Sequence, residues 1–285
     1  NPSAQYPLGR AARDLVEESR AAVAEALGCK SQQLLFTSCG TESDNWAIRA
    51  ALWQNRRVGK HIVATAVEHS AVLQCLKALE QEGYEVTLVK PDSTGCITAE
   101  QMAAALREDT ALVSMMLVNN ETGVRFPVEE VAALLKDRPT LLHTDAIQGF
   151  LKVPFTAAAL GADLIALSGH KVGAPKGIGA LYVGGKMKNP RPLLYGGGQE
   201  SGLRPGTEPV AQMAGFAEAV RRQKATMAED TAHMAACRDY VLAQTADIPG
   251  LVRIGEGSAP HILSLSLTGY PSQNIVSDLG EKGIL

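Results

Sequence analysis

The stretch "DLIALSGHKVGAPKGIGALYVG" (163–184) decides the fold class of this chain. An apolar strand pattern runs into a polar Ser-Gly-His-Lys turn and returns through glycines to a second apolar strand pattern. Lys171 stands where the first of these strands should end. Ligands in an open α/β sheet bind outside the carboxyl ends of the strands, so Lys171 is a candidate for chemistry.

Short apolar runs alternate with amphipathic stretches from residue 31 onward, which is typical of βαβ units around a mostly parallel sheet. Thr41 and Thr98 are placed as helix N-caps and Gly83 as a C-cap. The expected helices lie at 41–53, 70–83 and 98–109. The expected strands lie at 33–38, 61–66, 85–89, 111–118, 140–145, 163–168 and 179–184. The fold class is therefore α/β, with a seven-stranded sheet flanked by helices.

The pattern changes after about residue 225. A long helix is expected over 226–250, followed by "HILSLSL" (261–267), in which leucines and serines alternate as in a one-sided strand. We therefore expect a large domain at 1–225 and a smaller α+β domain at 226–285.

Composition narrows the function classes. The 285 residues are 46% hydrophobic, enough for a large core. A net charge of −3 gives no basic field for a phosphate backbone, so a small-molecule partner is expected and nucleic acid is not. The five cysteines form neither a C-x-x-C pair nor zinc-ligand spacing, which predicts no metal site and indicates free thiols in the cytoplasm. Neither a membrane span nor a secretion signal is visible.

The turn at 38–43, "SCGTES", follows the first expected strand and opens a helix. Free N–H groups and the positive end of the helix dipole make it a candidate anion site, although an ordinary capped helix start is the alternative. It lacks the P-loop and dinucleotide glycine patterns. A phosphate group would fit such a site.

Other strand ends carry weaker signals. His69 follows the second strand and fits an ordinary helix cap as well as a catalyst, while Asn119 and Asn120 near Gly123 fit a simple turn.

Asp145 and Lys171 end adjacent expected strands and fit either an ion pair or a cofactor site. A lysine that forms an imine and a carboxylate that keeps a ring nitrogen protonated are the pair that pyridoxal phosphate needs. With the anion turn as a seat for the 5′-phosphate, pyridoxal phosphate becomes the expected cofactor.

A series of ordered motifs carries a family resemblance. They are "NPS", "FTSCGTESDN", "VEHSAV", "VNNETG", "HTDAIQ", "SGHKVGAPKGIGALYV" and "GGGQESGLRPGTEPV". In order and spacing they resemble the cysteine desulfurases of the NifS/IscS type, which are class V aminotransferase-like, fold-type I pyridoxal phosphate enzymes. The resemblance covers nearly the whole chain.

The resemblance implies a role for each matching residue. Lys171 matches the catalytic Schiff-base lysine, Asp145 the partner of the pyridine nitrogen, and His69 the catalytic histidine that stacks on the ring and assists proton transfer. The other implied cofactor contacts are Asn120 and Gln148 near the 3′-oxygen, Gly40, Thr41, Ser168 and His170 in the phosphate cradle, and Thr207, which reaches the phosphate from the neighbouring subunit.

The implied activity is conversion of L-cysteine to L-alanine, with sulfur passed to an enzyme persulfide for iron–sulfur cluster or other sulfur-cofactor assembly. A homodimer and a scaffold or sulfur-acceptor protein are the implied partners. The cofactor residues alone do not separate this activity from an aminotransferase, a selenocysteine lyase, a β-lyase or a catalytically silent pyridoxal phosphate protein.

The sequence departs from the family pattern at Cys39 and at the chain ends. The family's nucleophilic cysteine and carboxylate-binding arginine are expected beyond Leu285, and a small-residue strand is expected before Asn1. Cys39 lies on the phosphate side, so a packing role is expected for it. We expect the chain as written to hold pyridoxal phosphate without desulfurating cysteine.

Overall fold

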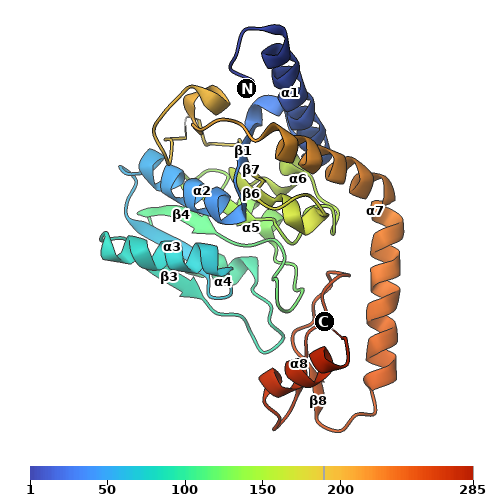
Figure 1. Cartoon of the computed structure of the whole chain (residues 1–285). Coiled ribbons are helices and arrows are strands. Elements are labelled where there is room, and N and C mark those ends of the chain that lie inside the picture. Colours follow the sequence, from blue (N-terminus) through green and yellow to red (C-terminus); the bar gives the residue numbers. More distant parts are fainter. Residues whose placement is uncertain (189, 285) are drawn as a thin grey trace.

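The computed structural model describes residues 1–188 and 190–284, so Leu285, the end of the expected small domain, lies outside the described residues. Seven strands form one sheet in the order β1-β7-β6-β5-β4-β2-β3 (Figure 1). They are β1 (Leu34–Thr37), β2 (His61–Thr65), β3 (Glu85–Val89), β4 (Thr110–Ser114), β5 (Leu141–Asp145), β6 (Leu164–Ser168) and β7 (Gly179–Val183).

The sheet is mostly parallel, as predicted. Strand β2 runs parallel to β3 and β4, and β4, β5 and β6 continue in parallel. Only β7 runs the other way, antiparallel to both β6 and β1. The chain passes outward from β2 to β3 and then returns to the other side of β2, so the β2–β4 boundary is the switch point at which α/β sheets bind ligands.

Strand β4 is shorter than predicted and ends at Ser114 instead of 118. Met115 still donates a backbone hydrogen bond to the carbonyl of His143. The N–H of Met116, however, donates to the Glu68 carboxylate at 2.8 Å. A side chain has therefore replaced the neighbouring strand as its partner.

Helices cover both faces of the sheet (Figure 1). They are α1 (Pro7–Leu27), α2 (Gly40–Gln54), α3 (Ser70–Gln81), α4 (Ala99–Ala104), α5 (Val128–Leu134), α6 (Ala157–Leu160), α7 (Val210–Thr245) and α8 (Ser272–Glu281). Short 3-10 turns, η1 (Ser31–Gln33), η2 (Gly169–Val172) and η3 (Gln199–Gly202), join some of them. The predicted helices at 41–53 and 70–83 correspond to α2 and α3, whereas α4 ends at Ala104, short of the predicted 109. Helices α1, α5, α6 and α8 were not predicted.

The predicted caps fare differently. The Thr98 hydroxyl accepts the Gln101 N–H at 3.2 Å and caps α4 as predicted. The C-cap residue of α3 is Glu82, and Gly83 follows it with a left-handed φ of 85°. Thr41 was wrongly predicted as an N-cap, because α2 begins one residue earlier, at Gly40. A Cβ at Gly40 would collide with Cδ1 of Ile147, so a larger residue would require the Ile147 side chain to move.

Alternation along the strands divides the core between the two faces. Leu35, Ile62 and Leu164 pack with α2 and α3, whereas Phe36 and Ile165 pack with α1, α5 and α7. Side chains two residues apart on a strand share a face. Leu141 of β5 packs on the α2 side, and so do His143 and Asp145.

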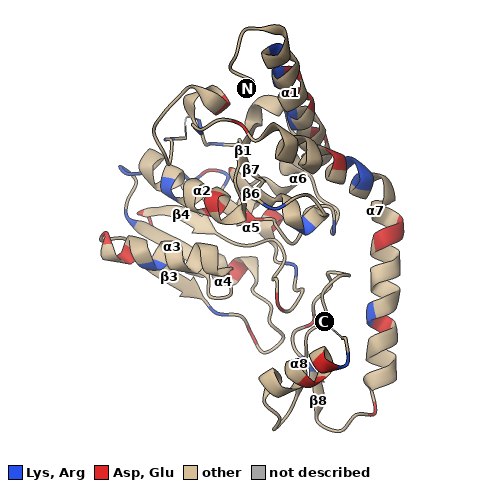
Figure 2. Cartoon of the chain, viewed as in Figure 1, with Lys and Arg blue, Asp and Glu red and all other residues tan. Residues whose placement is uncertain are grey.

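Helix α7 starts at Val210, earlier than predicted, and continues without a break past residue 225 to the C-terminal segment (Figure 1). That segment contains α8 and the two-stranded sheet of β8 (Leu251–Arg253) and β9 (Leu265–Leu267). The domain division at 225 and 226 stays a prediction. Among the described residues, no helix is both long and apolar enough to cross a membrane. Basic and acidic residues are interspersed along the elements (Figure 2).

Candidate active site

A cavity of about 260 Å³ lies at the carboxyl edge of the parallel strands, beside the start of α2. Its lining residues are Cys39, Gly40, Thr41, His69, Met116, Asn120, Asp145, Ile147, Gln148, Ser168, His170 and Lys171. Every residue predicted for the site is among them except Thr207, which lies exposed on the loop after η3.

Larger hollows lie elsewhere, including two of about 610 and 590 Å³. The first surrounds an ion pair between Arg20 and Glu200 and contains none of the predicted residues. The second shares His69 and Asn120 with the smaller cavity and extends to Ile254 in the C-terminal segment. The smaller cavity is the better candidate site, because the chemistry converges there and the second hollow adjoins it.

The anion side of the cavity is the first turn of α2. Cys39 precedes the helix in extended conformation, so the N–H groups of Gly40 and Thr41 begin the helix without partners in a preceding turn. Ser168 faces this turn at the end of β6, and its hydroxyl lies 2.9 Å from Nδ1 of His170. Backbone and side-chain donors therefore surround one end of the cavity.

Glu42 lies in this same first turn and carries a negative charge beside the anion side. Burial raises its pKa, but hydrogen bonds from Arg204 and from the Ser38 N–H outweigh burial and lower the pKa. Arg204 holds the Glu42 carboxylate with two hydrogen bonds of 2.9 and 3.1 Å. The carboxylate is thus neutralised, and the turn stays available for an anion.

Lys171 reaches the cavity from η2, the tight turn that follows β6. The Gly169 N–H donates to the Ile178 carbonyl at 3.0 Å and fixes the turn against the start of β7. The Lys171 side chain is exposed while it lines the cavity. Its amine is therefore accessible to a ligand.

Asp145 forms the opposite end of the cavity at the last position of β5. Its carboxylate accepts the Ile147 N–H at 2.9 Å. Burial, followed by the nearby Asp44 carboxylate, raises the pKa of Asp145 to about 8. A cationic ligand atom would reverse this shift, because an opposite charge favours the ionised carboxylate.

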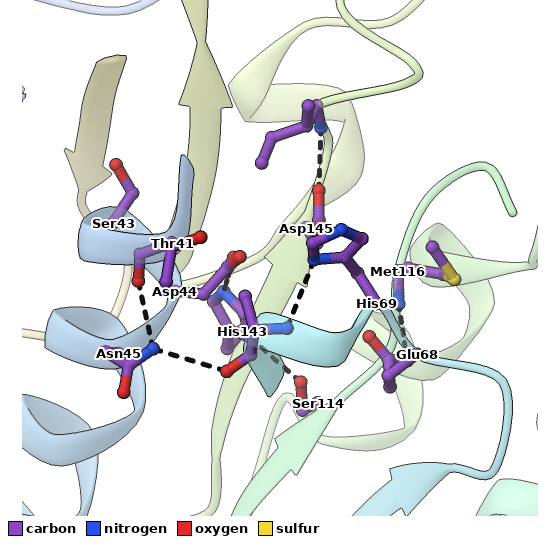
Figure 3. Close-up of polar contacts among 12 residues, drawn as sticks. Thr41, Ser43, Asp44, Asn45, Glu68, His69, Ser114, Met116, His143 and Asp145 are labelled. Carbon is purple, nitrogen blue, oxygen red and sulfur yellow. Dashed lines mark hydrogen bonds and ion pairs between the residues drawn. The ribbon is translucent and has the colours of Figure 1, made fainter. Parts of the chain in front are cut away.

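His69 combines the two roles that the sequence left open. Its Nδ1 accepts the Ala71 N–H at 3.1 Å and caps α3. Because Nδ1 is an acceptor, the neutral ring carries its proton on Nε2. The ring also lines the cavity and lies beside Asp145 (Figure 3).

Asn119 and Asn120 divide the two roles predicted for them. The Asn119 carboxamide oxygen accepts the backbone N–H groups of Glu121 and Thr122, at 3.0 and 2.9 Å, and holds the turn. Asn120 lines the cavity.

Beside Asp145 lie three residues for which no role was predicted: Asp44, Glu68 and His143, called the cavity floor below (Figure 3). His143 is fully buried, with Nδ1 2.9 Å from Ser114 Oγ and Nε2 3.3 Å from Asp44 Oδ1. Burial raises the pKa of Asp44 well above its usual value and that of Glu68 to about 7. One signal was present in the sequence, because Asp44 lies three and four residues before the buried Ala47 and Ile48 of α2.

The residues present fit pyridoxal phosphate. The cofactor has an anionic phosphate, a basic ring nitrogen and a carbonyl that condenses with lysine. The cavity offers the α2 turn, Asp145 and Lys171 in the corresponding positions. Among the described residues, both carboxylate oxygens of Asp44 lack a hydrogen-bond partner, so the floor is rich in acid groups and poor in cations. A protonated ring nitrogen would supply the missing positive charge.

Comparison with known proteins agrees with this geometry. The family model "Aminotransferase class-V" matches residues 1–285. Cysteine desulfurase IscS of Serratia proteamaculans is 38% identical over all of this chain and 71% of its own length. A solved structure described as a NifS-like protein is 36% identical, with a TM-score of 0.95 over 100% of this chain and 78% of its own. Another, described as SspA in complex with cysteine, is 29% identical, with a TM-score of 0.84 over 99% and 79%.

The chain spans 65 to 76% of the length of several curated relatives that it matches. Members of this family use pyridoxal phosphate, which is the group that the cavity fits. The chain belongs to the class V aminotransferase family, among the fold-type I cysteine desulfurases of the NifS and IscS type.

Proposed function

We propose that this protein is a pyridoxal phosphate-dependent cysteine desulfurase that converts L-cysteine to L-alanine. In this reaction the carbon–sulfur bond of cysteine breaks, a sulfur–sulfur bond forms on an enzyme thiol, and the substrate Cβ takes up a proton. The observation that carries the proposal is the convergence of Lys171, Asp145 and the α2 turn on one cavity. Relatives named cysteine desulfurase, and a relative described in complex with cysteine, support the choice of substrate.

Each polar residue of the cavity has a proposed task. When bound, pyridoxal phosphate supplies an electron sink for negative charge at the substrate Cα. Asp145 holds a proton on the ring nitrogen, and the Lys171 amine moves the Cα proton. His69 stacks on the ring and donates from Nε2. The remaining binding residues are Gly40, Thr41, Ser168 and His170 at the phosphate, with Asn120 and Gln148 at the 3′-oxygen.

Cys39 is the only cysteine among the described residues that lines the cavity. It is the N-cap residue that precedes the anion-binding turn of α2. A thiol at the phosphate end is poorly placed to meet substrate sulfur. We therefore propose that Cys39 packs beside the cofactor and that another thiol accepts the sulfur.

The protein is also proposed to act as a homodimer. Thr207 is exposed and lies outside its own cavity, which fits a residue that reaches the phosphate in a neighbouring subunit. Mixing a Lys171→Ala subunit with a Thr207→Ala subunit tests this. A residue acting across the interface restores one intact site per mixed dimer, whereas a residue acting within its own subunit restores none.

The proposed partner is an iron–sulfur scaffold or another sulfur-acceptor protein, with no role for nucleic acid or membrane. All five cysteines are free thiols, which fits the reducing conditions of the cytoplasm.

The experiment that tests the function is product analysis of the full-length protein loaded with pyridoxal phosphate. L-cysteine in the presence of a reducing thiol should give alanine and sulfide in equal amounts. Pyruvate and ammonia would identify a β-lyase instead, and a keto acid with aminated cofactor an aminotransferase. A parallel reaction with L-selenocysteine shows which substrate gives the higher kcat/KM. Cofactor uptake without any product would identify a silent protein.

A further inference from the structure

The floor of the cavity holds an ionisable pair that the proposed reaction does not use. Asp44 comes from α2 and His143 from β5, and both side chains are fully buried. Asp44 Oδ1 lies 3.3 Å from His143 Nε2. In the part of the chain that the structure describes, neither the Asp44 carboxyl group nor His143 Nε2 has a hydrogen-bond partner.

This pair is coupled to the candidate site through short distances. A carboxylate oxygen of Asp44, a ring nitrogen of His69 and a carboxylate oxygen of Asp145 all lie within 4.8 Å of one another. Asp44 therefore stands directly behind the carboxylate proposed to hold the ring nitrogen (Figure 3). At this separation in a buried site, ionisation of one carboxyl strongly opposes ionisation of the other.

The hydrogen bonds define where the protons lie. His143 Nδ1 lies 2.9 Å from Ser114 Oγ, which leaves Nε2 to face Asp44. Burial lowers the pKa of His143, and burial followed by the Glu68 charge raises the pKa of Asp44. Both directions favour neutral forms of Asp44 and His143, with the Asp44 carboxyl group 3.3 Å from the ring nitrogen that can accept its proton.

The other charged groups around the pair are few. Glu68 follows β2, and one of its oxygens accepts from Thr65 Oγ1 at 2.6 Å and from the Met116 N–H at 2.8 Å. Asp145 lies two residues beyond His143, His69 begins α3, and Lys171 lies across the cavity. Because Lys171 is exposed, no fully buried cation in the described residues offsets the floor carboxyls.

We propose that Asp44 is a positioning residue, which shares a proton with His143 and thereby sets the charge that Asp145 presents to the cofactor ring. This inference rests on the proposed function, because it assigns Asp44 a task toward pyridoxal phosphate. An uncharged Asp44 leaves Asp145 as the single carboxylate that pairs with the ring nitrogen. The pair can also take up the charge change when the ring nitrogen gains or loses its proton.

The test compares Asp44→Asn with Asp163→Asn in the full-length protein. Asparagine keeps the shape of Asp44 and a donor toward His143 but removes its titration. Asp163 is an equally suitable control, because it is buried, its pKa is raised by burial, and it lies at the start of β6, away from the cavity. The readouts are the affinity for pyridoxal phosphate and the pH dependence of the bound cofactor's visible absorbance.

Asp44→Asn should bind the cofactor and shift the midpoint of that absorbance change by about one pH unit, whereas Asp163→Asn should leave it unchanged. A folded Asp44→Asn protein with the wild-type midpoint would overturn the inference but not the proposed function. Failure of the wild-type protein to bind pyridoxal phosphate would instead overturn the proposed function.

A measurement on the wild-type protein covers the case in which Asp44→Asn does not fold. Nitrogen NMR of the His143 ring should show a neutral imidazole with its proton on Nδ1 at pH 7 before the cofactor is added. Cofactor binding should shift the Nε2 resonance. A His143 that is already cationic at pH 7, or one that does not respond to the cofactor, would contradict the shared proton.

Discussion

The Arg20–Glu200 pair and the carboxyl groups at the cavity are both buried, but their charges are compensated differently. Glu200 accepts both terminal nitrogens of Arg20, at 2.6 and 2.7 Å, and also the Phe36 N–H at 2.9 Å. Glu200 keeps these contacts although its backbone φ of 46° lies in the left-handed region, which residues other than glycine rarely adopt. At the cavity, by contrast, Asp145 accepts one backbone N–H, and the Asp44 carboxyl group lies 3.3 Å from His143 without a hydrogen-bond partner among the described residues.

This difference in pairing distinguishes an ion pair that stabilises the fold from carboxyl groups that are placed to bind a ligand. The Arg20–Glu200 pair is complete within the chain, so it holds the loop that precedes Thr207 against α1 and β1. Within the described residues, the carboxyl groups of the cavity floor lack a cationic partner, which destabilises the cofactor-free protein. The same groups stabilise a cationic ring once it is bound.

The largest effect of a substitution is expected on turnover, at Asp145 in the cavity. Asp145→Ala should keep pyridoxal phosphate bound through Lys171 and the α2 turn, but an unprotonated ring nitrogen withdraws electrons poorly. Turnover in the full-length protein should fall by about 10³ or more, equivalent to at least about 4 kcal/mol. Steady-state alanine production checks this, and a wild-type rate would make Asp145 purely structural.

Removing the Arg20–Glu200 ion pair should lower the free energy of unfolding instead of the turnover. Glu200→Ala removes the buried partner of Arg20 and leaves its guanidinium paired, among the described residues, only with the exposed carboxylate of Glu17; loss of a buried partner costs about 3 to 5 kcal/mol. Urea unfolding should show this decrease in the free energy of unfolding. Exposed Glu218→Ala is the matched control, because Glu218 pairs with Arg222 at the surface and should change stability by less than about 1 kcal/mol. Equal effects in the two variants would remove the distinction.

The buried carboxyl groups at the cavity should also make the stability of the cofactor-free protein depend on pH. The pKa of Asp145 is about 8 in the fold and 3.8 in the unfolded chain, so the folded state binds more protons between these values. The free energy of unfolding should therefore fall as pH rises from about 4 to 8, and Glu68, with a pKa of about 7, adds to this fall. His143, whose pKa burial lowers, acts in the opposite sense below about pH 6.5.

Asp145→Asn should reduce this slope and stabilise the cofactor-free protein by about 2 kcal/mol at pH 8, because the amide needs no ionisation. Thermal unfolding of both proteins at pH 5 and pH 8 checks the prediction. A variant less stable than wild type at both pH values would contradict it.

The smallest effect is expected at Cys39. Its side chain makes no capping hydrogen bond to α2, so Cys39→Ala should change the free energy of unfolding by less than about 1 kcal/mol. Sulfur transfer in the full-length protein should persist. Loss of persulfide formation with normal cofactor binding would make Cys39 the sulfur acceptor.

Sequence patterns predicted those parts of the fold that depend on local periodicity. The apolar runs located the strands, and the polar residues at their ends located the cavity, because parallel strands bring these ends to one edge. The start of α7 at Val210 was missed, since proline and glycine around 205–209 hid the change from loop to helix. The floor was missed because Asp44, Glu68 and His143 come from separate elements and meet only through packing.

Thr207 marks another limit of the same kind, since a contact between two subunits leaves no periodic signal in one chain. Its predicted role follows from the motif alone, and the mixed-subunit experiment decides it.

The central claim is that Lys171 carries pyridoxal phosphate in the cavity that Asp145 closes at the other end. Borohydride reduction of the loaded protein, followed by proteolysis and mass spectrometry, fixes the cofactor to the lysine that holds it. The account predicts one pyridoxyl group per chain, on the peptide that contains Lys171, and no label in Lys171→Ala. A label on Lys176, or a labelled Lys171→Ala protein, would contradict the claim.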